Sequence, residues 1–248
     1  FVAAYGEDGR CETVVIEDAS GRRAIRARAF VDATGSARLV REMGLPARRN
    51  DPLQPPTTCG LFGGLEALGR ALPNFNLTRA VFDESNPHRL PPGFLWSAEI
   101  PGLDDMTMVA GTRVHGTDGA DADSLTRAEI EGRRQLRCIA DTVREASKYA
   151  GVNVGLAATA SHIGLRETRH AECLYTLTER DVLTGRDFDD TVALGSYRVD
   201  IHHADRGGLT FRYLDGREVE LGPDGIRREG RWRDEGGESP TFYRIPYR

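Results

Sequence analysis

The stretch Phe30-Val31-Asp32-Ala33-Thr34-Gly35 decides the fold. The run from Ala24 to Val31 first alternates and then turns wholly apolar, and Ala37 to Met43 has helical spacing up to Gly44. A strand is therefore predicted to lead through a turn of small residues into a helix. Small residues let the backbone approach a bulky ligand, and Thr34 adds a hydroxyl or an N–H for a phosphate or ribose. A plain packed turn would contain the same residues.

Working outward, two hairpins are expected. Thr13 to Ile16 and the run that begins at Ala24 are joined by Asp18-Ala19-Ser20-Gly21, which predicts the first hairpin. Phe94 to Ile100 and Met106 to Val114 predict the second antiparallel pair. The proline-rich and arginine-rich segment from Leu45 to Pro56 is typical of a linker.

A long helix follows, with Ser124 or Thr126 as its N-cap and Gly151 as its end. Farther along, the pattern predicts a β-compatible segment, a strand end that passes into a capped helical turn, and a further hairpin. These lie at Ala157 to Gly164, at Tyr175 to Leu183 with its cap at Thr178, and at Phe211 to Leu214 before Asp215-Gly216. The expected fold class is α+β, mainly antiparallel sheet with one long helix.

Composition excludes several classes of protein. The net charge of -5 argues against a nucleic-acid partner held by counterion release. No run of about 18 uncharged apolar residues occurs, so no membrane span is expected. The widely spaced cysteines Cys11, Cys59, Cys138 and Cys173 form no C-x-x-C pair, which predicts reduced thiols. With no export signal visible, a cytoplasmic location is expected.

Two clusters carry candidate chemistry. Arg166, Glu167 and Arg169 could bind a carboxylate substrate or a developing negative charge, with Glu167 orienting one arginine, or they could form a structural ion-pair network. Both alternatives stay open. Asp200, His202, His203 and Asp205 contain metal-ligating groups. Strand alternation would place Asp200 beside His202 and His203 on the other face. A hydrogen-bonded Asp–His pair, or an ordinary polar surface, is therefore favoured over a metal site.

A family resemblance enters through three stretches. They are Phe30 to Gly35, Gly164 to Arg169 followed by Tyr175 to Thr178, and Gly195 to His202. In this order, with the long helix before the last two, they resemble FAD-dependent oxidoreductases whose substrate domain is inserted into the FAD domain. The resemblance implies a small molecule as substrate and FAD as cofactor, contacted by Ala33, Thr34 and Gly35. Ser36 stands where family members often carry an acidic residue.

The resemblance also implies functional roles and a domain layout. Arg166, Glu167, Arg169 and His202 become catalytic candidates, and the Asp–His pair would lie near the flavin. The layout comprises a remnant of the α/β FAD-binding domain (1–45), a substrate domain (46–195), and its end with a return towards the FAD domain (196–248).

No G-x-G-x-x-G turn occurs in the sequence. On the family reading, this turn would lie upstream of Phe1 and the segment closing over the flavin beyond Arg248, so we expect an internal fragment that is inactive alone. A non-catalytic α+β domain that holds an anionic ligand is the alternative.

Overall fold

The chain forms two compact units. The computed structural model describes residues 1–203, 207–222, 226–234 and 238–248. The first unit contains residues 1–51, 167–176 and Arg248, and the second contains 52–166 and 177–247. The sequence-based domain bounds concern functional domains, which compactness does not test, and they stay a prediction.

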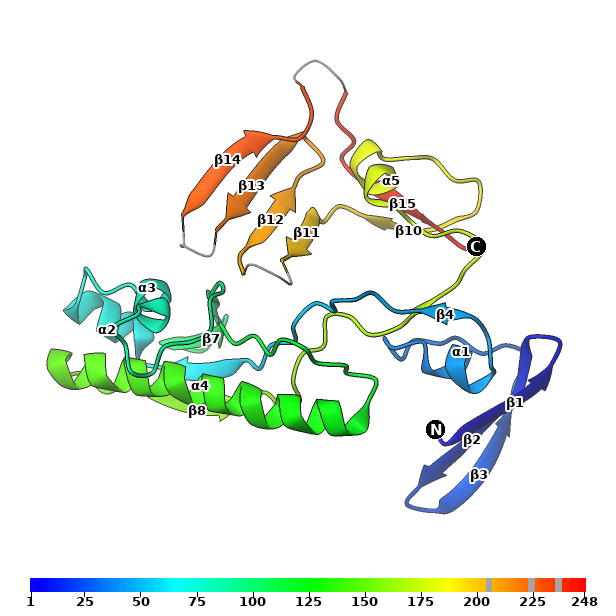
Figure 1. Cartoon of the computed structure of the whole chain (residues 1–248), viewed down its shortest axis with the longest axis horizontal. Helices are drawn as coiled ribbons and strands as arrows, with labels where there is room; N and C mark the ends of the chain where they lie inside the picture. The colour runs from blue at the N-terminus through cyan, green and yellow to red at the C-terminus, as the bar shows by residue number, and fades with distance from the viewer. Residues whose placement is uncertain (204–206, 223–225, 235–237) are drawn as a thin grey trace. The chain divides into compact units, whose positions relative to one another are not determined.

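The first unit is built on a three-stranded antiparallel sheet (Figure 1). Its strands are β1 (Ala3–Glu7), β2 (Arg10–Asp18) and β3 (Gly21–Arg26), so the predicted hairpin is confirmed. Helix α1 (Arg38–Glu42) follows, and β4 (Ala47–Arg48) pairs with β9 (His170–Ala171). Gly44 lies just after α1 with φ +66°, a conformation that suits glycine at a helix end.

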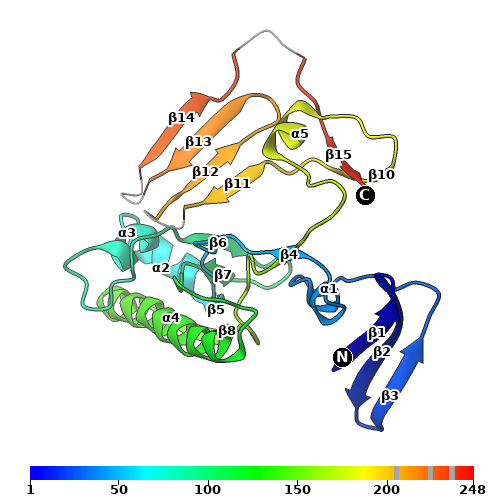
Figure 2. The same cartoon turned by 45° about the vertical axis from the view of Figure 1, so that its right-hand side comes forward.

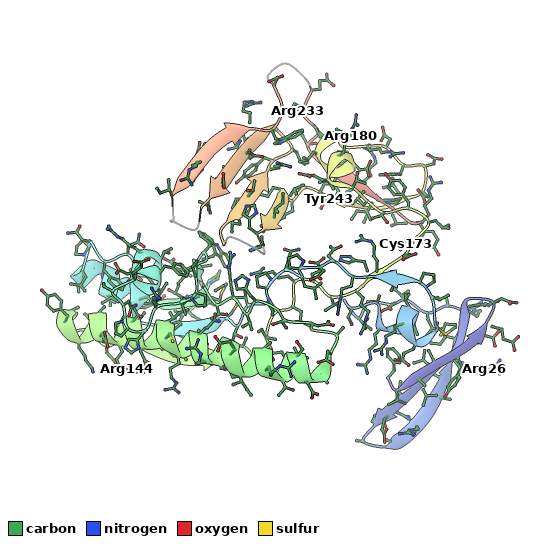
Figure 3. All side chains as sticks on the ribbon, in the orientation of Figure 1. Arg26, Arg144, Cys173, Arg180, Arg233 and Tyr243 are labelled. Carbon is green, nitrogen blue, oxygen red and sulfur yellow. The ribbon has the colours of Figure 1, made fainter. Side chains whose placement is uncertain are left out.

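The predicted strand to Val31 is wrong in its second half. Arg26, labelled in Figure 3, is the last residue of β3, and residues 27–33 form no strand. The Val31 residue is 88% exposed. An apolar run becomes a strand only where a neighbouring strand accepts its hydrogen bonds, and none of the described residues pairs with this segment.

The second unit contains a four-stranded sheet in the order β6-β7-β5-β8. These strands are β5 (Gly60–Gly63), β6 (Trp96–Glu99), β7 (Met106–Ala110) and β8 (Gly155–Thr159), and the predicted β6–β7 pair is confirmed. Helix α4 (Ala122–Ala150) lies along this sheet in both views (Figures 1 and 2). Phe62, Val109 and Ile139 are fully buried in the core between them.

The N-cap of α4 differs from the one that the sequence predicted. Asp121, not Ser124 or Thr126, caps the helix, and its Oδ1 accepts a hydrogen bond of 2.7 Å from the Ser124 amide. A carboxylate at this position also interacts favourably with the positive end of the helix dipole. The Ser124 hydroxyl instead accepts from the Asp118 amide. The predicted end at Gly151 is confirmed.

Three further helices belong to the second unit. Helices α2 (Leu65–Ala71) and α3 (Leu77–Phe82) follow β5. Thr178 caps α5 (Glu179–Thr184) as predicted, in a capping box with Asp181. Residues 175–177 form no strand, so the predicted strand end before this cap is wrong.

A second antiparallel sheet of four strands completes this unit (Figure 2). It runs β11 (Val199–His202), β12 (Leu209–Arg212), β13 (Arg217–Leu221) and β14 (Arg227–Arg231). The predicted hairpin at Asp215-Gly216 is the β12–β13 turn. A separate ribbon pairs β10 (Thr191–Gly195) with β15 (Tyr243–Pro246). The predicted α+β class is confirmed, and none of the described helices is long and apolar enough to cross a membrane.

Candidate functional site

The second unit contains a pocket of about 410 Å³. Loops and strands form its described wall, and no residue of that wall comes from a helix. Three arginines, one aspartate and one histidine project polar groups at it, among aromatic and aliphatic side chains. The lining consists of Thr57, Cys59, Phe94, Trp96, Ala110, Thr112, Arg113, Gly164, Leu165, Arg166, Tyr197, Arg198, Asp200, His202, Leu209 and Phe211.

Arg113 is the most buried of these charges, with 4% of the residue exposed. Its position is fixed by Gln135 of α4, whose side-chain amide accepts from the Arg113 amide at 2.8 Å and donates to the Arg113 carbonyl at 2.9 Å. Beyond the end of β7, Gln135 thus makes the pair of backbone hydrogen bonds that a neighbouring strand would otherwise make. The Arg113 guanidinium donates from Nη1 to the Gly208 carbonyl at 3.3 Å.

Burial makes this positive charge costly. It lowers the pKa of Arg113 to about 10, with Arg166 lowering it further and Asp200 opposing the shift. Arg113 therefore stays charged at neutral pH, but in surroundings that favour the arrival of a negative charge.

Arg166 joins the pocket from the loop after β8. Its Nε donates to the Pro55 carbonyl at 3.0 Å and its Nη2 to the Thr57 hydroxyl at 2.7 Å. Desolvation lowers the pKa of Arg166, while Asp200 and Cys59 oppose that change. The residue as a whole remains exposed, so water screens this charge more than that of Arg113. The same Arg166 charge opposes the rise that burial causes in the pKa of Cys59.

Arg198, Asp200 and His202 line the pocket from β11 and the residue before it. His202 Nε2 lies 3.3 Å from Asp200 Oδ1, which is an ion-pair distance without hydrogen-bond alignment. Burial alone would raise the pKa of Asp200, but His202, Arg198 and Arg166 together lower it. The Arg198 guanidinium lies 3.9 Å from the centre of the Phe211 ring. The predicted juxtaposition of Asp200 and His202 is confirmed.

His203 faces away from Asp200, as alternation along a strand predicts, and its Nε2 lies 3.0 Å from the Thr210 hydroxyl. Asp205 lies outside the described residues. Within the described ranges, no group of three or more His, Cys, Asp or Glu could hold a metal ion.

The division between the two units falls within the predicted Arg–Glu–Arg cluster, between Arg166 and Glu167. In the first unit, Glu167 Oε1 accepts from the Asn50 amide and lies 2.9 Å from His170 Nε2. Arg166 and His202 therefore line one pocket, whereas Glu167 and Arg169 belong to the other unit. The catalytic roles of all four residues stay predictions.

The Ala33-Thr34-Gly35 turn also lies in the first unit, next to α1. Asp32 Oδ2 accepts from the amides of Leu39 and Val40 at 2.9 and 3.2 Å. The Thr34 hydroxyl donates to Asp32 Oδ1 at 2.7 Å and accepts from the Arg38 amide at 3.0 Å. Its hydrogen is therefore committed within the turn and does not suit a phosphate.

The backbone of the turn, in contrast, fits a cofactor contact. All three turn residues are exposed. Gly35 has φ +72°, and apart from its chain neighbours no residue has an atom within 4 Å of the place where a Cβ would stand. A flat or bulky group could lie against this backbone, which glycine keeps open. The turn thus fits FAD through its backbone and not through the Thr34 hydroxyl.

Sequence reasoning missed Arg113 and Arg198 as site residues. Arg113 interrupts an otherwise small and apolar run, Val109-Ala110-Gly111-Thr112-Arg113-Val114, and a charge in such a run signals a buried group with a task. Arg198 shares the face of Asp200 and His202 by alternation along β11, so the predicted Asp–His pair already pointed to it.

Comparison with known proteins supplies the remaining evidence. No curated protein and no solved structure matches the chain. A family model described as FAD dependent oxidoreductase matches residues 1–248. The match includes both the small-residue turn of the first unit and the arginine-lined pocket of the second. The chain therefore belongs to the FAD-dependent oxidoreductase family.

Proposed function

We propose that this chain supplies the substrate pocket of an FAD-dependent oxidoreductase that acts on a small molecule. The observation that carries the proposal is the pocket of about 410 Å³, in which Arg113, Arg166 and Arg198 converge beside an Asp–His pair. Convergent polar groups in a largely apolar hollow are typical of small-molecule sites. The role of the second unit as a substrate domain is part of this proposal.

The residues of the pocket have different roles in this proposal. Arg113 and Arg166 bind and orient the substrate through their guanidinium groups. His202 lines the pocket beside Asp200, and we assign to it the exchange of a proton with the substrate. Its Nδ1 has no hydrogen-bond partner. FAD, when bound, supplies the redox chemistry by taking up two electrons from the substrate.

The first unit meets the cofactor through the backbone at Ala33, Thr34 and Gly35. The sequence contains no G-x-G-x-x-G turn, which is the usual cradle for the pyrophosphate of a dinucleotide. We therefore assign the pyrophosphate to residues other than these 248, in a complete flavoprotein that contains this chain.

The contact at Gly35 predicts a specific loss of FAD affinity. In the complete flavoprotein, Gly35→Val strains a backbone with φ +72° and adds bulk where the cofactor would lie, so the FAD dissociation constant should rise at least about tenfold, or about 1.4 kcal/mol. FAD titration of the apoprotein gives this constant.

Gly44→Val is the matched control, because Gly44 lies in the same unit with φ +66° and, apart from its chain neighbours, no residue has an atom within 4 Å of its would-be Cβ. Backbone strain should lower the melting temperature of both variants, and only Gly35→Val should weaken FAD binding. Equal dissociation constants for Gly35→Val and wild type would remove the turn from the cofactor site.

The proposed function is tested by flavin content and flavin reduction. The complete flavoprotein should purify with FAD, and an anaerobic screen of small organic substrates should find one that bleaches the visible flavin band. The 248-residue chain alone should purify colourless. A complete protein that binds no flavin would contradict the proposal and would favour a non-catalytic domain that holds an anionic ligand.

A further inference from the structure

Three positive charges line the pocket of the second unit with little to balance them. Within the part of the chain that the structure describes, Arg113, Arg166 and Arg198 form no ion pair with a carboxylate, unlike surface arginines such as Arg70, which pairs with Glu66. Asp200 is the one acidic side chain in the described lining. The pocket therefore carries a net positive charge.

Each of the three guanidinium groups keeps unused capacity. Arg113 makes one side-chain hydrogen bond, to Gly208, and Arg166 uses Nε and Nη2 but not Nη1. Arg198 Nε is buried and has no hydrogen-bond partner, and its plane lies over Phe211. A buried donor without an acceptor is costly, so these groups suit a ligand that brings acceptor oxygens.

The remaining wall selects the rest of the ligand. Phe94, Trp96, Leu165 and Leu209 offer apolar surface in a cavity of about 410 Å³. Inorganic phosphate would leave this surface bare. Phosphate sites also commonly use backbone amides at a helix N-terminus, and no helix contributes to the described lining.

From this arrangement we infer that the substrate is an organic carboxylate, whose head lies between Arg113 and Arg166 and whose apolar body packs beside Phe94 and Trp96. The inference names the substrate class of the proposed oxidoreductase and in that sense rests on the proposed function. The binding step itself needs no flavin. A planar carboxylate matches the planar fork of a guanidinium, so the head also fixes the orientation of the body.

Binding by the 248-residue chain tests this inference directly. Isothermal titration calorimetry compares benzoate, cinnamate and 3-phenylpropionate with their neutral amides. The difference in affinity within each pair measures what the negative charge contributes to binding. At least one acid should bind at least about tenfold more tightly than its amide, which corresponds to about 1.4 kcal/mol. Inorganic phosphate should neither bind nor compete.

Two variants with opposite expected effects on affinity test whether the organic acid binds in this pocket. Arg166→Lys keeps the charge but loses the fork, and the affinity for the acid should fall at least about fivefold. Asp200→Asn removes the one negatively charged side chain of the described lining, so the affinity for the organic acid should rise at least about fivefold. Arg70→Lys, at an exposed ion pair outside the pocket, is the matched control and should leave the affinity unchanged. Circular dichroism checks that each variant is folded.

The outcomes separate this inference from the proposed function. If no acid binds more tightly than its amide, if phosphate competes, or if Asp200→Asn leaves the affinity of a folded protein unchanged, the carboxylate assignment is overturned. Carboxylate binding in a chain whose complete protein holds no FAD would support this assignment and contradict the oxidoreductase. Flavin reduction by neutral molecules and by no carboxylate would support the oxidoreductase and contradict the carboxylate assignment.

Discussion

Replacing Arg113 with Met should make the protein more stable and, in the complete flavoprotein, nearly inactive. Arg113 is 4% exposed and has one side-chain hydrogen bond, to the Gly208 carbonyl. That carbonyl also accepts from the His203 amide, so the substitution leaves no buried acceptor without a partner. Met fills a similar volume without a charge, and the free energy of unfolding should rise by about 1–3 kcal/mol. Turnover should fall at least about 100-fold.

The pH dependence of this gain has a definite sign. The pKa of Arg113 in the folded protein is about 10, below the ordinary pKa of an arginine, so the charged side chain destabilises the fold below about pH 10. This cost disappears as the pH rises above about 10 towards the ordinary pKa of an arginine, because the side chain in the folded protein then loses its proton. The difference in melting temperature between Arg113→Met and wild type should therefore be full at neutral pH and shrink above about pH 10.

Melting temperature and turnover are measured on the same preparation, with Arg70→Met as the control for loss of an exposed arginine. That control should change neither quantity appreciably, because exposed ion pairs contribute little. A lower melting temperature together with full activity per folded molecule would identify Arg113 as a structural residue and contradict its role in the pocket.

Arg166→Lys should lower turnover in the complete flavoprotein by roughly 10- to 100-fold, at about 1.4 kcal/mol per factor of ten. The Arg166 guanidinium donates to Pro55 and Thr57 from two different nitrogens, and a lysine ammonium cannot hold both contacts and also present a fork to the substrate. Steady-state kinetics with the substrate found by flavin bleaching measures this loss.

Arg169→Lys, measured in parallel, tests the sequence-based role of Arg169, which lies in the first unit and not in the lining of the pocket. A melting temperature that falls for Arg166→Lys while activity per folded molecule stays constant would mean that Arg166 only braces the loop at Pro55 and Thr57.

Local patterns predicted those elements whose partners are close in the chain. The hairpin at Asp18 to Gly21, the β6–β7 pair and the end of α4 at Gly151 follow from turn residues and periodicity. The predicted strand to Val31 does not form, because a strand needs a neighbouring strand to pair with. The local sequence pattern does not show whether such a neighbour exists. The N-cap of α4 was misplaced because Asp121, Ser124 and Thr126 are all acceptable cap residues, and hydrogen-bond geometry decides among them.

The pocket could be predicted only in part for the same reason. Asp200 and His202 are two residues apart, so alternation along β11 was enough to bring them together. Arg113 and Arg166 are far apart in sequence, and Gln135 positions Arg113 from a helix that no motif links to it. Residues next to each other in sequence can also belong to different units, as Arg166 and Glu167 do, and no local pattern predicts such a division.

A crystal structure of the complete, FAD-loaded protein with the carboxylate that reduces its flavin tests the central claim most directly. The account predicts that the carboxylate head contacts Arg113 and Arg166 and that its body lies beside Phe94 and Trp96. A ligand bound elsewhere, with this pocket filled only by water, would contradict it.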